Sequence, residues 1–311
     1  MPAFGRRALM AGCGAALLAP PPVSGGDTGV VEVAPGVFVL PGVMEEASSA
    51  NLDGIGNVGF VVGEAAVAVI DPGGSLAHGQ RLRQAVSAVT PLPVRHLVLS
   101  HVHPDHVMGG TAFADLGVEV IGHAGLPAAL AQRHDFYAAM LEREMGSAGK
   151  GSGALAPTRL VEPGQELALD LGGRVLVLTA HPPAHTDHDL SALDRRTGTL
   201  WLADLLFVER IPSLDGSLPG WRGVLAALGA VPAARAVPGH GPAAVPWPGA
   251  AGPLLRYLDM LERETRAAIA AGIGIAEAPS HVANAEAAQW RLAEAYHGRN
   301  VTAAYRELEW E

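Results

Sequence analysis

The segment Ser100-His101-Val102-His103-Pro104-Asp105-His106 follows directly on an apolar run. Four side chains that can bind a metal ion therefore lie within six residues, at the end of a predicted strand. Because side chains alternate along a strand, His101 and His103 are expected to face the same side. As the loop turns, Asp105 and His106 can reach a neighbouring point. The spacing favours two adjacent metal ions, and imidazole with carboxylate suits zinc, with iron or manganese as alternatives.

A second loop rich in histidine follows the apolar strand predicted over Val175–Ala180. It contains His181, His185 and His188, and each of the three could supply a metal ligand. The residues alone leave this choice open, because a histidine near a strand end can also be a structural or a solvated group.

Two further candidates lie later in the chain. Asp204 is a lone carboxylate within the apolar run Thr199–Phe207, and its burial is costly unless a cation or hydrogen-bond donors compensate it. A buried acid satisfied by hydrogen bonds is the alternative. His240 stands between Gly239 and Gly241, where the backbone can bend sharply around a site. Together with the two histidine loops, these positions indicate a metal site.

These motifs, in this order, resemble those of the metallo-β-lactamase-fold superfamily over residues 29 to 272. The resemblance implies an α/β fold, a four-layer αββα sandwich with two sheets between outer helices. It also implies two zinc ions per chain. The implied ligands of the first zinc are His101, His103 and His185, and those of the second are Asp105, His106 and His240, with Asp204 bridging the two.

The resemblance also bears on the loop after Val175–Ala180, because the family motif has a threonine directly after its ligand. This selects His185, which precedes Thr186, over His181, for which a structural role at the strand end is expected. His188 is predicted to assist catalysis, as a group that supports the ligands or as an oxyanion donor, with a solvated loop histidine as the alternative.

Within the superfamily, the chain is most similar to the periplasmic zinc metallohydrolases of quinoprotein relay systems. The stretches that carry this likeness are Asn57–Gly63, Ala184–Leu190, Leu214–Trp221 and the tail from Asn300 to Glu309. The likeness implies a pathway link to quinone-dependent dehydrogenases. It does not supply the substrate.

The implied metal pair predicts a hydrolase. Two divalent ions about 3.5–4 Å apart lower the pKa of a bridging water enough to give hydroxide near neutral pH. Asp105 is predicted to orient that hydroxide and to accept a proton. The expected substrate is a small molecule with a carbonyl-type bond, which is an ester, thioester, lactone or lactam.

Three other functions remain compatible with the motifs. A β-lactamase or lactonase proper uses the same metals and differs in pocket shape. A mononuclear-iron persulfide dioxygenase keeps a similar histidine motif but uses only part of it. A non-catalytic, metal-stabilised periplasmic binding module is the third, although a structural zinc needs only four closed ligands.

The composition favours one large catalytic domain and excludes nucleic acid as a partner. A chain of 311 residues with 49% hydrophobic content can bury a full core. Its net charge is −10, and Lys150 is its only lysine. Because no basic run is longer than the pair Arg6-Arg7, a surface that tracks phosphates is not expected. No apolar run after the first 25 residues is long enough to span a bilayer.

The N-terminus resembles a bacterial export signal of the twin-arginine type. Arg6-Arg7 precede a weakly apolar stretch, Ala8–Ala19, that ends at Pro20-Pro21-Pro22. The expected location is therefore the periplasm. Cys13 is the only cysteine, so a mature chain that begins after it would form no disulfide.

The predicted domains are the export signal at 1–26, the catalytic domain at 27–272 and a C-terminal helical extension at 273–311. The expected strands are Val30–Val33, Val37–Leu40, Gly59–Val62, Ala66–Ile70, Leu160–Leu171, Arg174–Ala180, Thr199–Phe207 and Arg235–Val237, with the strand before His101. The expected helices are Gln80–Ala88, Pro127–Met145, Trp221–Leu228 and Leu254–Ala271. This alternation is consistent with two sheets between outer helices.

Overall fold

A computed structural model of the chain describes Met1 and residues 29–311. The predicted export signal, with Arg6, Arg7 and Cys13, lies outside the described residues apart from Met1. Within the described part of the chain, we find no helix that combines the length and the hydropathy needed to cross a membrane.

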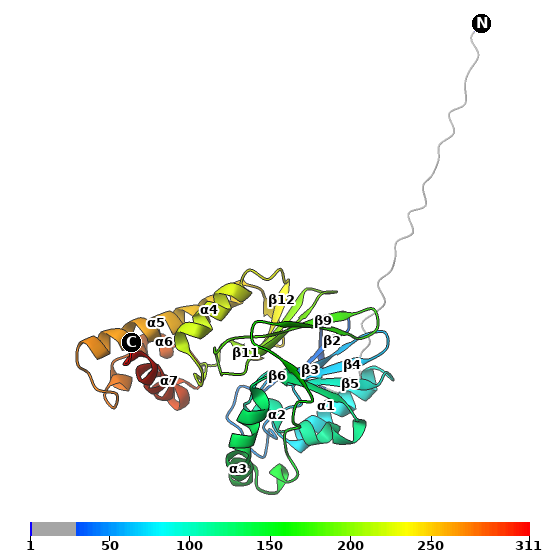
Figure 1. Ribbon diagram of the computed structural model, residues 1–311, viewed down its shortest axis with the longest axis horizontal. Coiled ribbons are helices and arrows are strands. Elements are labelled where there is room, and N and C mark those ends of the chain that lie inside the picture. Colours follow the sequence, from blue (N-terminus) through cyan, green and yellow to red (C-terminus); the bar gives the residue numbers. More distant parts are fainter. Residues whose placement is uncertain (2–28) are drawn as a thin grey trace.

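Two β-sheets form the centre of the fold (Figure 1). The seven-stranded sheet has the order β1 (Val31–Ala34), β2 (Val37–Leu40), β3 (Val58–Val62), β4 (Val67–Ile70), β5 (Val94–Val98), β6 (Glu119–His123), β7 (Arg159–Val161). The six-stranded sheet has the order β13 (Val245–Pro246), β12 (Arg235–His240), β11 (Thr199–Phe207), β10 (Leu190–Asp194), β9 (Val175–Ala180), β8 (Glu166–Asp170). Neighbours pair in parallel from β4 to β7 and between β11 and β12.

Helices lie outside the sheets (Figure 1). The α-helices are α1 (Leu76–Val89), α2 (Pro104–Val107), α3 (Leu126–Met145), α4 (Leu218–Leu228), α5 (Gly252–Ala270), α6 (Asn284–Ala287) and α7 (Ala293–Leu308). Short 3₁₀ helices are η1 (Gly110–Leu116), η2 (Gly146–Gly149), η3 (Gly249–Ala251) and η4 (Ala278–Ser280).

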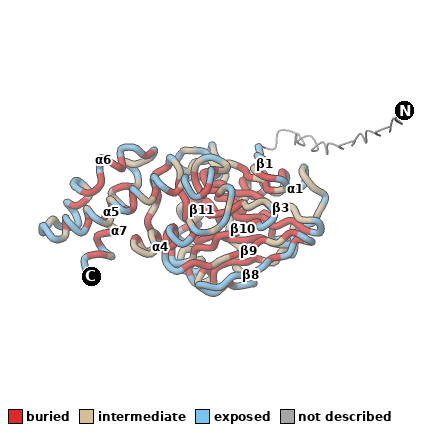
Figure 2. Tube along the Cα trace, turned by 90° about the horizontal axis from the view of Figure 1, so that it is seen from above, coloured by how far each residue is buried: buried red, intermediate tan, exposed pale blue. Residues whose placement is uncertain are grey.

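Three hydrophobic clusters hold four layers together. The cluster between the sheets includes Ile121 from the first sheet and Leu178 from the second. A second cluster packs α1, through Leu82, on the outer face of the first sheet. The third packs α4 and α5, through Trp221 and Leu258, on the second sheet. The predicted αββα sandwich is confirmed, and Figure 2 shows the buried strands of the second sheet.

Burial explains the pattern of the central strands. Every residue of β11 is buried because both of its faces are covered, as expected for a strand with a parallel neighbour inside a layered fold. The loop after β5 is tied to the second sheet, since the Leu190 amide donates to the Ser100 carbonyl at 2.7 Å. The two histidine loops are thereby held side by side.

The expected strand Leu160–Leu171 is wrong as a single element. The chain turns at residues 162–165, where the Gln165 amide donates to the Glu162 carbonyl at 2.9 Å and Gly164 has a φ of +77°. A positive φ suits glycine, and Pro163-Gly164 is a turn signal. The two halves, β7 and β8, belong to different sheets. Three further strands, β6, β10 and the two-residue β13, were not among the expected elements.

The C-terminal residues pack against the second sheet's helices. Val301 and Leu308 of α7 belong to the same cluster as α4 and α5. The Glu307 carboxylate accepts hydrogen bonds from the Ser217 hydroxyl at 2.6 Å and from the Leu218 amide at 2.8 Å. Because the first amides of a helix have no partner within it, Glu307 helps to cap the start of α4.

Candidate metal centre

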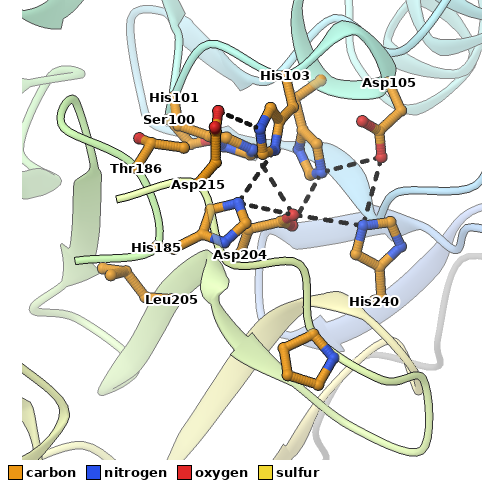
Figure 3. Close-up of polar contacts among 12 residues, drawn as sticks. Ser100, His101, His103, Asp105, His185, Thr186, Asp204, Leu205, Asp215 and His240 are labelled. Atoms are coloured by element: carbon orange, nitrogen blue, oxygen red, sulfur yellow. Dashed lines mark hydrogen bonds and ion pairs between the residues drawn. The ribbon is translucent and has the colours of Figure 1, made fainter. Parts of the chain in front are cut away.

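The structure brings the seven predicted ligands together in two groups (Figure 3). One group is His101, His103, His185 and Asp204, and the other is Asp105, His106 and His240. Within each group the ligand atoms lie within 4.8 Å of one another. All of these residues are buried except His103, which is partly exposed.

The short helix α2 explains how near neighbours in the sequence reach different groups. Pro104 starts this helix, where its missing N–H is not needed and its fixed φ suits the first turn. His101 and His103 precede the helix and belong to the first group. Asp105 and His106 lie within its single turn and belong to the second.

Distances within the first group are short. His103 Nδ1 lies 3.1 Å from His185 Nε2. Asp204 Oδ2 lies 3.6 Å from His101 Nε2 and 3.3 Å from His185 Nε2. Nitrogen and oxygen ligand atoms thus converge on one point.

The second group shares Asp204 with the first. Asp105 Oδ2 lies 3.3 Å from His240 Nε2 and 3.5 Å from His106 Nε2. Asp204 Oδ1 lies 3.0 Å from His106 Nε2, and Asp204 Oδ2 lies 3.4 Å from His240 Nε2. Asp204 therefore contacts histidines of both groups, as a bridging ligand would.

The burial of three candidate ligand atoms shows whether cations fit this centre. His101 Nε2, His106 Nε2 and Asp204 Oδ1 are buried and, apart from the 3.0 Å approach of the last two to each other, have no hydrogen-bond partner among the described residues. A buried polar atom without a partner is costly, and native proteins rarely leave one. Divalent cations would be the missing partners, and a histidine and carboxylate set is the donor set of zinc. The residues present fit a pair of such ions.

Asp71, at the end of β4, orients two of the histidines. Its carboxylate accepts from His106 Nδ1 at 2.9 Å and from the Ser100 hydroxyl at 2.7 Å. Ser100 Oγ in turn lies 2.9 Å from His101 Nδ1. Each ring therefore carries its proton on Nδ1 and leaves Nε2 free for a metal. Sequence reasoning missed this role, because Asp71 stood only in a predicted turn.

Asp215 orients the ring of His103 in the same way. Its Oδ2 lies 3.2 Å from His103 Nε2 and 3.1 Å from Arg133, so His103 presents Nδ1 to the first group. Despite partial burial, the hydrogen bond from His103 lowers the pKa of Asp215 to about 2. Sequence reasoning also missed this role, although Leu214–Trp221 was one of the stretches carrying the likeness.

The last histidine is fixed by the backbone. His240 Nδ1 donates to the Ile55 carbonyl at 2.9 Å, which leaves Nε2 for the second group. Asn57 holds the same turn, because its side-chain amide donates to the Pro238 carbonyl at 2.9 Å.

The two groups differ in how readily their histidines take a proton. Burial lowers the pKa of His101 well below its ordinary value and that of His185 to about 3. Burial also acts on His106 and His240, but nearby carboxylates, Asp204 first, outweigh it and raise both pKa values. The second group therefore competes more strongly for protons.

The other two histidines of the second loop lie outside both groups. His181 is buried, and its Nε2 lies 2.7 Å from the Ser191 hydroxyl. His188 packs against His123, with ring centroids 5.9 Å apart, and against Gly125.

A pocket of about 470 Å³ opens over the two groups. His103, Asp105, Asp204 and His240 line it next to the ligand atoms. Its walls include Met140 and Glu144 of α3, the buried Asp53, Arg210, and Tyr296 and Arg299 of α7. A small molecule could therefore reach the candidate ligands from this side.

Most of the chain is similar in structure to solved proteins, at low sequence identity. A metallo-beta-lactamase from Pontibacter korlensis has a TM-score of 0.57 and 16% identity, covering 74% of this chain and 98% of that chain. The stereoselective inverting sec-alkylsulfatase Pisa1 from Pseudomonas sp. has a TM-score of 0.67 and 17% identity, and the match covers 90% of this chain and 50% of that chain. A metallo-beta-lactamase from Hirschia baltica has a TM-score of 0.54 and 17% identity, and the match covers 70% of this chain and 91% of that chain. No curated protein matches the chain.

These structural likenesses show the fold. A family model adds sequence evidence, because the model of the metallo-beta-lactamase superfamily matches residues 52–240. That range contains all seven candidate ligands, from His101 to His240, and more than half of the chain. The chain therefore belongs to the metallo-beta-lactamase superfamily.

Proposed function

We propose that this protein is a hydrolase that uses two zinc ions to cleave a carbonyl-type bond, which is an ester, thioester, lactone or lactam. The observation that carries the proposal is Asp204, whose carboxylate contacts histidines of both groups. A single closed zinc site needs only four ligands, whereas this centre has seven.

Zinc bound in such a pair lowers the pKa of a water molecule and polarises a carbonyl oxygen. His101, His103 and His185 would hold the first ion, and Asp105, His106 and His240 the second, with Asp204 between them.

Asp105 is the proposed proton acceptor. Although burial opposes its ionisation, the charge of His106 and the hydrogen bond from His240 keep the pKa of Asp105 far below its usual range. An ionised carboxylate that lines the pocket and turns Oδ2 toward the second group can orient water and accept a proton at its other oxygen, Oδ1. His188 has no role in this proposal, because it packs against His123 and does not line the pocket.

The test of the proposal begins with metal content. Protein purified without chelator is expected to carry close to two zinc ions per chain. As the pH falls, the second group should lose its ion first, because a proton and a metal ion compete for the same nitrogen and the pKa values of His106 and His240 are raised. Elemental analysis after stepwise acid dialysis measures both. One iron per chain would instead support a persulfide dioxygenase.

Single substitutions show which residues hold each of the two ions. His240→Ala should lose mainly the second ion and His185→Ala mainly the first. His134→Ala, in an exposed side chain of α3, should keep both. Chelation should abolish hydrolysis in a panel of ester, thioester, lactone, cephalosporin and sec-alkyl sulfate substrates, and zinc should restore it. Hydrolysis that survives full metal removal would refute the proposal.

We also propose that the chain is exported to the periplasm and serves a quinoprotein relay system. The proposal is supported by Arg6-Arg7 and by the stretches that resemble those metallohydrolases. Replacing Arg6 and Arg7 by lysine should leave the precursor in the cytoplasm, as measured by cell fractionation. The same change at Arg195 and Arg196 is the matched control and should not alter export. Unchanged periplasmic delivery of the first variant would rule out the twin-arginine route.

A further inference from the structure

The loop at residues 211–216, between β11 and α4, contacts two candidate ligands of the first group. The Asp215 carboxylate lies 3.2 Å from His103 Nε2 (Figure 3). The Asp215 amide donates to the His185 carbonyl at 3.0 Å. A displacement of this loop would therefore reach both His103 and His185.

The loop depends on other parts of the chain for its conformation. Residues 211–216 belong to no helix or strand, so no regular element pairs their backbone groups. Pro212 and Leu214 are buried. Because buried amides and carbonyls need a hydrogen-bond partner, the groups that bond to Pro212 and Leu214 decide where the loop lies.

Asn300 of α7 supplies those partners. Its side-chain amide group donates to the Pro212 carbonyl at 2.7 Å, and its side-chain oxygen accepts from the Leu214 amide at 3.0 Å. Only 2% of the surface of Asn300 is exposed, so water has little access to these bonds. One side chain thus holds the backbone on both sides of Ser213, directly before Asp215.

Asn300 is itself held in place by a chain of buried groups. Its Nδ2 also donates to the Tyr257 hydroxyl at 3.0 Å, and that hydroxyl lies 3.0 Å from His297 Nδ1. His297 Nε2 donates to the Val282 carbonyl at 2.8 Å, so Nδ1 of the neutral ring accepts from Tyr257. These bonds fix the orientation of the Asn300 amide group.

Two further contacts join the C-terminal residues to the same loop. The Ile211 amide donates to the Arg291 carbonyl at 3.0 Å, and Glu307 accepts from the hydroxyl of Ser217, directly after the loop, at 2.6 Å. Helix α7 lies outside residues 52–240, which the family model matches. The support for the loop therefore comes from a part of the chain that the family model does not cover.

We propose that Asn300 is a positioning residue of the metal centre and acts on the first ion through Asp215 and His103. By holding Pro212 and Leu214, Asn300 keeps the Asp215 carboxylate against His103 Nε2. His103 then presents Nδ1 to the first ion. The inference rests on the proposed pair of ions and adds the residue of α7 that sets the affinity for one of them.

Asn300→Leu tests the inference, because leucine has nearly the shape of asparagine but no donor or acceptor. The change is made in His240→Ala, which should keep only the first ion, and in His185→Ala, which should keep only the second. Zinc is titrated against a competing chelator. We expect the Kd to rise about tenfold in the first background and to stay unchanged in the second. An unchanged Kd in the first background would overturn the inference.

Glu286→Gln is the control for general loosening of the C-terminal helices. Glu286 is buried in α6, and its hydrogen bonds among the described residues lead to Arg256, Gln289 and Trp290. The substitution should lower the thermal stability and leave the Kd of the first ion unchanged. If Glu286→Gln weakened the first ion as much as Asn300→Leu does, α7 would support the fold alone and the inference would fail.

A second variant serves if Asn300→Leu does not fold. Tyr257→Phe removes only the hydroxyl that accepts from Asn300 and leaves both bonds to the loop in place. We expect the Kd of the first ion to rise about threefold, because the amide group is less firmly oriented. An unchanged Kd in this variant would then count against the inference in the same way.

Nitrogen-15 NMR of the histidine rings in metal-free protein separates this inference from the proposed function. In the wild type His103 should be protonated on Nε2, as its hydrogen bond to Asp215 requires. In Asn300→Leu we expect a mixture of both tautomers. This result supports the inference even if the protein binds no zinc and cleaves no substrate, in which case the hydrolase proposal fails alone. If zinc is not bound, the same single tautomer in both proteins overturns the inference.

Discussion

Replacing Asp204 by asparagine is expected to lower metal content below two ions per chain and to reduce hydrolysis by about 100-fold or more. Asp204 is buried, and its carboxylate lies 3.0 to 3.6 Å from ligand nitrogens of both groups. Burial opposes its ionisation, but the surrounding histidines, His240 first, hold the pKa of Asp204 well below its ordinary value. The amide keeps the shape and removes the charge that would neutralise both ions.

The matched control for Asp204→Asn is another buried acid of the second sheet. Asp194 in β10 pairs with the buried Arg174 at 2.7 Å and lies outside both groups. Asp194→Asn should therefore lower stability, by about 3 kcal/mol, with metal content unchanged. Bound zinc and thermal unfolding are measured on both variants. If Asp204→Asn kept two ions and ordinary turnover, Asp204 would be a structural acid rather than a bridge.

The second large effect is expected from Gly56→Ala. A Cβ at Gly56 would lie 2.7 Å from His106 Nε2 and 3.3 Å from Asp105 Oδ2, which are two ligand atoms of the second group. The methyl group would occupy space that the second ion needs. We expect metal content to fall to about one ion per chain and hydrolysis to fall by about 100-fold. Elemental analysis and turnover under saturating zinc measure both effects.

Gly223→Ala is the control for Gly56→Ala. Gly223 lies in α4, and a Cβ there meets no heavy atom within 4 Å. The substitution should keep both ions and stabilise the helix by about 0.5–1 kcal/mol. Two ions retained in Gly56→Ala would mean that the second ion does not sit between His106 and Asp105.

The ligand positions were accessible from the sequence because each follows or interrupts an apolar run. The family motif, with its threonine after the ligand, selected His185 over His181, and the structure places His185 in the first group and His181 beside Ser191. The identity of the bound metal and the exported location stay predictions.

The groups that orient the ligands were not accessible in the same way. Asp71 and His106 are 35 residues apart, and Asp215 and His103 are 112 apart. Both aspartates stand in ordinary turn or loop sequences, where that residue type has many other uses. Only chain folding shows which histidine each one contacts.

The sequence by itself determined the residue types of the candidate centre and the period of most strands, since these depend on side-chain chemistry and on spacing between near neighbours. The four-layer architecture was predicted from the resemblance that those motifs carry. The tertiary structure decided what depends on remote packing. It assigned β7 and β8 to different sheets, although they come from one apolar stretch. It also placed α7 beside the loop at residues 211–216, so that Arg299 and Arg306 border cavities. Arginines seven residues apart lie on the same face of any helix. The opposite face of α7 is buried through Val301 and Leu308, and this packing decides which cavities the arginine face borders.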